Sequence, residues 1–103
     1  STNFKSDREG LRAAQKHIKI ADEFRENALL NFLSMQDARI ESENAYLYYQ
    51  NAHSFNPNNA VLNYKMASVL LFTNRKEFAK EYLDKAILLS IKRSTPILGG
   101  SPR

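Results

Sequence analysis

One stretch, residues 56–91, constrains the fold of this chain more than any other. It opens with Asn56-Pro57, breaks at Thr73-Asn74, and carries large apolar residues at helical spacing on both sides of the break. Small residues stand where two antiparallel helices would approach closely: Ala67, Ala79 and Ala86. The pattern predicts a helix-turn-helix unit of about 34 residues, a length typical of repeat architectures.

The rest of the chain favours the same all-α class. Its 103 residues, 43% hydrophobic and 25% charged, suit one small soluble domain or a piece of a larger protein. Neither glycine nor proline occurs between Gly10 and Pro57, whereas a sheet protein would need regular turns there. The absence of cysteine excludes disulfides and thiolate metal sites.

We predict four helices, at about residues 7–35, 41–55, 58–73 and 75–92. Residues 6–9 have the form of a capping box, and a chain reversal is expected between Ser34 and Ser42, either of which could cap the next helix. Asn56 precedes a proline and should end the second helix. Because residues 94–103 contain two prolines and two glycines, we expect a flexible tail or the truncated start of a next helix.

An internal repeat links the two halves of the chain. Ala45, Tyr49 and Ala52 have the same spacing as Ala79, Leu83 and Ala86, 34 residues later. This small-large-small pattern resembles the second helix of a tetratricopeptide repeat, and residues 60–93 fit a whole unit through Met66-Ala67 and Leu70. Asn63 replaces the usual tryptophan, and Asn74 replaces the loop glycine, a mild change because asparagine tolerates the left-handed conformation.

The first repeat allows two registers. Strict counting makes Leu29, Phe32 and Leu33 its first-helix positions, whereas the alternative places that helix at residues 18–24, followed by about a dozen inserted residues. We favour the second register. Residues 1–93 then read as a solenoid of about two tetratricopeptide units with a long N-terminal helix.

A narrower resemblance supports that register. The segments 3–5, 9–10, 18–19, 21–22, 55–60, 62–65 and 81–86 resemble the N-terminal repeat region of Bacteroidetes outer-membrane-associated proteins of the OmpA family. In that family the repeats precede a β-propeller and a peptidoglycan-binding module, and at least one member serves type IX secretion. The resemblance implies a periplasmic, outer-membrane-associated scaffold whose partners are envelope or secretion components.

The residues themselves indicate binding rather than catalysis. The sequence contains no nucleotide loop, nucleophile elbow or metal cluster, so we expect no enzyme and no cofactor. His17 and His53 are far apart and read as ordinary histidines. The basic residues Arg8, Arg12, Lys16 and Lys19 lack interleaved aromatics, which favours a solvated face over nucleic-acid binding. No apolar run approaches the ~20 residues that cross a bilayer.

Two surfaces are candidates for binding. The groove positions of the repeat select Val61, Tyr64, Ser68, Leu71 and Phe72 as a site for a protein or peptide, unless the long N-terminal helix fills that groove itself. Since solenoids usually need three or more repeats, the last helix should leave an edge for a next repeat or a second copy, at Ile87, Leu88 and Ile91.

Overall fold

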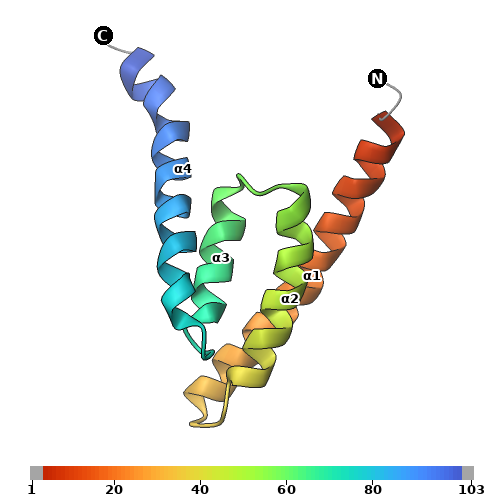
Figure 1. The fold of residues 1–103 in the computed structure, drawn as a ribbon, viewed down its shortest axis with the longest axis vertical. Coiled ribbons are helices and arrows are strands. Elements are labelled where there is room, and N and C mark those ends of the chain that lie inside the picture. The colour runs from red at the N-terminus through yellow and green to blue at the C-terminus, as the bar shows by residue number, and fades with distance from the viewer. Residues whose placement is uncertain (1–3, 101–103) are drawn as a thin grey trace.

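The computed structural model describes the backbone of residues 4–100 and the side chains of residues 7–92. Within this range the chain forms no strand, only four α-helices and one short 3-10 helix (Figure 1). These are α1 (Phe4–Leu33), α2 (Arg39–Phe55), α3 (Ala60–Leu70), η1 (Lys76–Phe78) and α4 (Ala79–Gly100). The all-α prediction is confirmed.

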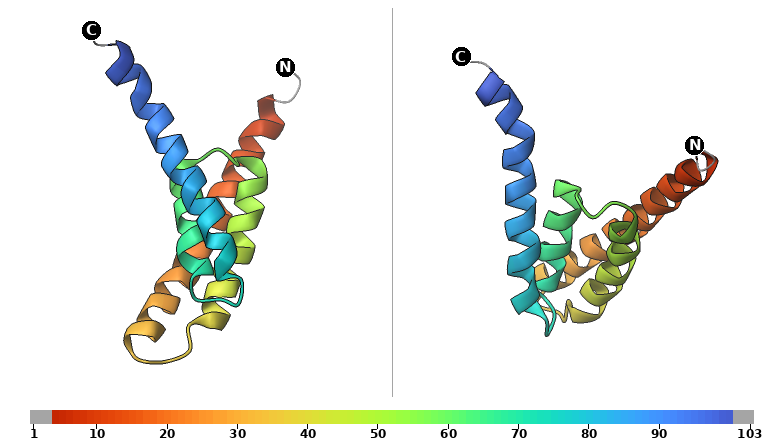
Figure 2. Two further views of the ribbon diagram at one scale, coloured as in Figure 1. Left: turned by 60° about the vertical axis from the view of Figure 1, so that its left-hand side comes forward. Right: turned by 45° about the horizontal axis from the view of Figure 1, so that its top comes forward.

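Consecutive helices run antiparallel and pack in chain order, α1 on α2, α2 on α3 and α3 on α4. The free ends of α1 and α4 diverge, as the views in Figures 1 and 2 show. The molecule measures 50 × 39 × 20 Å, so its thin dimension is about two helix diameters. The core lies where α1, α2 and α3 meet, around Tyr49, Met66 and Leu70, which are fully buried.

Alanines at seven-residue spacing hold the first helix pair together. They are all buried, and they form one row on α1 and another that begins at the N-cap of α2: Ala14, Ala21, Ala28, and Ala38, Ala45, Ala52. A seven-residue spacing keeps side chains on one face of a helix, and small side chains allow an interaxial distance near the lower end of ~8–10 Å. The seven-residue spacing is visible in the sequence, but the 34-residue repeat includes only Ala45 and Ala52 of these six alanines.

Gly10 is placed inside α1, where glycine costs helix stability. A Cβ atom at this position would lie 2.6 Å from Cε1 of Phe55. The glycine therefore lets the last aromatic ring of α2 pack directly on the backbone of α1.

The turn between α1 and α2 closes with a Schellman motif. The Gln36 amide donates to the Asn31 carbonyl at 2.7 Å and the Met35 amide to the Phe32 carbonyl at 3.0 Å. Met35 has a φ of 62°, the only positive φ at a non-glycine residue in the described chain. The left-handed residue is therefore Met35, and Asn74, the loop position where we considered it, has an ordinary φ.

The start of α2 differs from the two serine caps that we considered. The N-cap is Ala38, and the Asp37 carboxylate accepts from the Arg39 amide at 2.9 Å. Ser42 lies inside α2, fully buried, and its hydroxyl has no hydrogen-bond partner among the described residues. The end of α2 is as predicted, since Asn56 follows the last helical residue.

Side-chain hydrogen bonds fix both ends of α3. Asn59 caps the start, because its Oδ1 accepts from the Leu62 amide at 2.9 Å. The helix ends at Leu70, three residues earlier than predicted. The buried Thr73 hydroxyl explains this end, since it donates to the Leu70 carbonyl at 2.8 Å and accepts from the Arg75 amide at 3.0 Å.

The last helix corrects our prediction for the end of the chain. We expected the helix to stop near residue 92, but α4 continues to Gly100. Pro96 lacks the amide that would donate to the carbonyl four residues earlier, and a proline ring inside a helix crowds that carbonyl, but the backbone remains helical through this position. Residues 101–103 of the predicted tail lie outside the described part. None of the described helices has the length and apolarity to span a bilayer.

Candidate protein-binding surface

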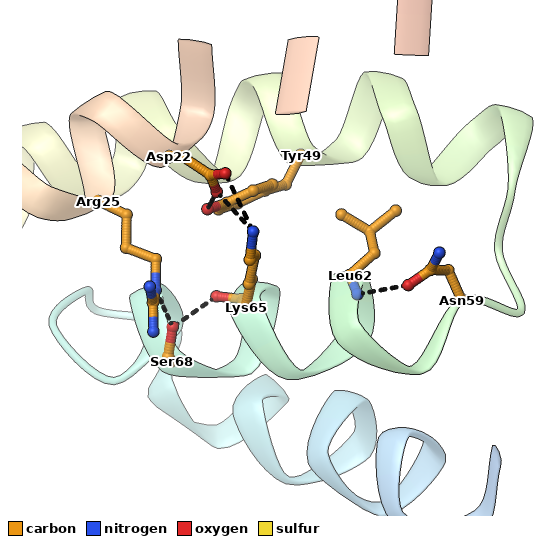
Figure 3. Close-up of polar contacts among 7 residues, drawn as sticks. All are labelled: Asp22, Arg25, Tyr49, Asn59, Leu62, Lys65 and Ser68. Atoms are coloured by element: carbon orange, nitrogen blue, oxygen red, sulfur yellow. Dashed lines mark hydrogen bonds and ion pairs between the residues drawn. The ribbon is translucent and has the colours of Figure 1, made fainter. Parts of the chain in front are cut away.

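One carboxylate joins three helices on the side where α1 passes α3 (Figure 3). The Tyr49 hydroxyl on α2 donates to Oδ1 of Asp22 on α1 at 2.5 Å. The Lys65 ammonium on α3 donates to both oxygens of the same carboxylate, at 3.1 and 3.0 Å. Burial raises the pKa of Tyr49 above its usual value and the hydrogen bond to Asp22 raises it further, so the hydroxyl remains a donor.

Further contacts hold α1 along α3. Arg25 Nε donates to the Ser68 hydroxyl at 2.8 Å, and Ser68 donates to the Lys65 carbonyl at 2.7 Å (Figure 3). The Phe32 and Phe72 rings are tilted against each other with centroids 5.1 Å apart. A cavity of about 570 Å³ remains between these two helices, and its charged lining contains both signs: Asp22, Glu26, Arg25 and Lys65.

Four of the five predicted groove residues line cavities on the α4 side of α3, and Phe72 lies on the α1 side alone. Ser68 and Phe72 face α1 and line the 570 Å³ cavity. Val61 and Tyr64 are exposed and line cavities on the other side of α3, against α4. Leu71 is exposed, and both Leu71 and Ser68 border the two sides of α3, since each lines a cavity on either side. The long N-terminal helix thus lies along one side of α3, with the 570 Å³ cavity between them, and leaves the other side open.

The open side carries a continuous apolar surface, which we call the α3/α4 face. It consists of exposed large side chains from two adjacent antiparallel helices: Val61, Tyr64, Leu71, Leu83 and Ile87. Two cavities, of about 410 and 350 Å³, lie along it. Exposed apolar side chains gathered in this way mark interaction sites more often than singly scattered ones do.

The predicted edge residues largely belong to this same face. Ile87 and Ile91 are exposed and line the 410 Å³ cavity together with Val61 and Tyr64. Leu88 is also exposed but does not line that cavity. Sequence reasoning treated the groove and the edge as separate sites, whereas the structure brings most of both onto one surface.

The internal repeat provides a comparison of covered and open positions. Tyr49 on α2 and Leu83 on α4 are equivalent in the 34-residue repeat, and the alanines beside them, such as Ala52 and Ala86, are buried in both helices. Tyr49 is 0% exposed because α3 packs over α2, but Leu83 is 40% exposed. No described element covers α4 as α3 covers α2.

Two tyrosines and the two histidines lie in contacts between helices. The Tyr46 and Tyr82 hydroxyls lie 3.0 Å apart, and burial raises the pKa of Tyr82 above its usual value. His17 packs on Tyr48 and His53 on Tyr82, so the two histidines belong to different contacts. No group of three potential metal ligands occurs among the described residues.

Comparison with known proteins adds no relative to this description. The chain matches no family model, no curated protein and no solved structure.

Proposed function

We propose that this chain is a non-catalytic interaction module that binds a helical segment of another protein on its α3/α4 face. The observation that carries the proposal is the exposure of Leu83, at the position where the first repeat buries Tyr49 under a third helix. Covering this face would remove a row of large apolar side chains from water, at ~25 cal/mol per Å² of apolar area.

The molecule itself supports a helix as the ligand. Within the chain, α3 packs in the same relation to α2 that a bound helix would have to α4. A groove between two antiparallel helices accepts side chains at helical spacing, in the order i, i+3 or i+4, and i+7. The expected ligand is therefore an amphipathic helix with three or four apolar anchors.

The cellular setting is a second part of the proposal. The segments that resemble the repeat region of OmpA-family proteins support a tetratricopeptide module in a periplasmic, outer-membrane-associated assembly linked to type IX secretion. Envelope or secretion components are then the partner class. In such a setting, we expect a charge substitution on the α3/α4 face to cause a secretion defect.

An alternative function has its own observation. The contacts of Asp22 with Lys65 and of Phe32 with Phe72 hold the chain's own first helix against one side of α3. A structural module that associates with a second copy through Ile87 and Ile91 would need no other ligand. We favour the first proposal because the open face is lined by residues of both α3 and α4, as a helix-binding groove requires.

Selection from a displayed peptide library tests the proposal. The library contains amphipathic peptides of roughly four helical turns, about 15 residues, and the selected peptides are measured by fluorescence anisotropy. We expect Ile87→Lys to abolish their binding. The matched control is Leu47→Lys, at an equally exposed apolar position on α2 away from the face, which should leave the affinity unchanged.

The outcome that contradicts the proposal is equally direct. If the selection yields no binder, or if its binders tolerate Ile87→Lys, the α3/α4 face is not a helix-binding site. Sedimentation over a concentration range separates the alternative, because self-association that Ile87→Lys abolishes would identify a second copy as the natural occupant.

A further inference from the structure

The chemistry of the α3/α4 face indicates more than apolarity. Building on the proposed function, we infer that the bound helix carries an acidic residue within one turn of a large apolar anchor. The anchor enters the 350 Å³ cavity, and Lys76 with Lys80 receives the carboxylate. The acidic residue thereby orients the partner helix on the face.

Small residues leave room for an apolar side chain in this 350 Å³ cavity, which we call the socket. Its lining includes two buried alanines, Ala67 from α3 and Ala79 from α4, between the larger Tyr64, Leu71 and Leu83. Small residues at the closest approach of two helices leave depth where larger ones would fill it. A volume of 350 Å³ is near the lower limit of ~300–1,000 Å³ for ligand pockets, which suits one side chain and its flanks.

The charge at this socket has one sign. Lys76 and Lys80 line the cavity, and no acidic residue does. Lys80 is compensated by Asp84, with Nζ and Oδ2 2.6 Å apart, whereas the Lys76 ammonium makes no hydrogen bond or ion pair with the described residues. A carboxylate from a partner would therefore meet an uncompensated cation beside an apolar pocket.

Two neighbouring cavities lack this arrangement. The 410 Å³ cavity at the other end of the face has no charged residue in its lining, so the charge marks one end only. In the 570 Å³ cavity beside α1, Asp22 and Glu26 offset Arg25 and Lys65. An acidic preference is thus expected on the α3/α4 face and not beside α1, and it fixes which end of the partner lies near η1.

The test uses the full chain and the same peptide library. We expect the selected peptides to be enriched in Asp or Glu within three or four positions of a Leu or Phe. Changing that acid to Gln or Asn in the best binder should weaken its affinity about two- to fivefold, as expected for an exposed ion pair. The loss should shrink as the salt concentration rises.

A charge-reversed protein supplies the second arm. For Lys76→Glu/Lys80→Glu we expect a repeated selection to enrich Lys or Arg beside the anchor in place of the acids. The matched control is Lys16→Glu/Lys19→Glu, which makes the same change of net charge on exposed residues of α1. This control should keep the acidic preference.

The outcomes separate the inference from the proposed function. Binders that need Ile87 but show no acidic enrichment, or an enrichment that the α1 control also reverses, overturn the inference and leave the proposed function in place. Binders that tolerate Ile87→Lys overturn both. A dimer that Ile87→Lys dissociates makes a second copy the occupant and also overturns the inference.

Discussion

The two helix pairs of this molecule follow the same sequence pattern and differ in what lies over them. In the pair α1/α2, the large residue of the small-large-small pattern, Tyr49, is buried by α3 and hydrogen-bonded to Asp22. In the pair α3/α4, the equivalent Leu83 is partly exposed beside two cavities. The pattern therefore specifies how two helices pack, and a third helix decides whether the outer face is core or surface.

The largest effect that can test this comparison comes from truncating both equivalent residues. Tyr49→Ala should lower the free energy of unfolding by about 3–5 kcal/mol, because it empties a fully buried aromatic position. Leu83→Ala should cost about 1 kcal/mol, a fraction of the ~2–5 kcal/mol for a buried leucine. Urea denaturation measures both. Equal losses would mean that the α3/α4 face is already covered in solution.

Substitution of Asp22 tests whether its carboxylate holds α3 against the pair α1/α2. Asp22→Ala leaves the Tyr49 hydroxyl without its acceptor and Lys65 without its counterion, so we expect a loss of about 1–3 kcal/mol in urea denaturation. Asp22→Asn should cost less, because an amide oxygen still accepts from Tyr49. Asp84→Ala removes the exposed pair on α4 and should lie within error. If Asp22→Ala cost no more unfolding free energy than Asp84→Ala, the Asp22 contacts would not hold α3 in place.

Much of the fold was predictable because its signals are local. The stop at Asn56-Pro57 and the number of helices follow from proline geometry and apolar spacing, and both are confirmed. The extent of α4 was not predictable in this way. A proline lowers the preference for helix but does not exclude it, and the backbone remains helical through Pro96.

The candidate site was predictable only in part, because its grouping depends on contacts distant in sequence. The helical positions of Tyr64 and Ser68 can be read from the chain, but α1 lies beside only one of them. The contacts that place α1, from Asp22 to Lys65 and from Arg25 to Ser68, each span 43 residues. No local sequence pattern indicates such pairs. The sequence analysis therefore assigned residues from two sides of α3 to one groove.

The turns that close the two pairs allow a finer comparison. Met35→Gly should stabilise the chain by about 0.5–1 kcal/mol, because a left-handed backbone strains methionine and not glycine. The greater entropy of the unfolded glycine variant offsets part of this gain. Asn74→Gly, in the loop that closes the second pair, should destabilise by about 0.4–1 kcal/mol through that entropy alone. Thermal denaturation of both variants decides. If both variants were stabilised, or both destabilised, the two turns would not differ in backbone conformation as described.

The smallest effect is expected at His53, at one of the side-chain contacts between α2 and α4. The ring packs on Tyr82, with centroids 5.7 Å apart. Burial is the main cause that lowers the pKa of His53. The contact with Asn63 raises this pKa in part, and the charge of Lys85 lowers it again. The unfolded chain then binds the proton more readily, so this contribution to stability is complete above about pH 6.5 and is lost as the pH falls through the folded-state pKa.

Comparison of the native chain with His53→Gln isolates this contribution. Because the side chain is only partly buried, the difference in unfolding free energy between the two proteins should narrow modestly as the pH falls from about 7.5 to 5.5, above the range where most carboxylates titrate. His17→Gln serves as the control, since it changes a histidine that contacts α2 and not α4. If the difference in unfolding free energy stayed constant with pH, protonation of His53 would not weaken its contact with Tyr82.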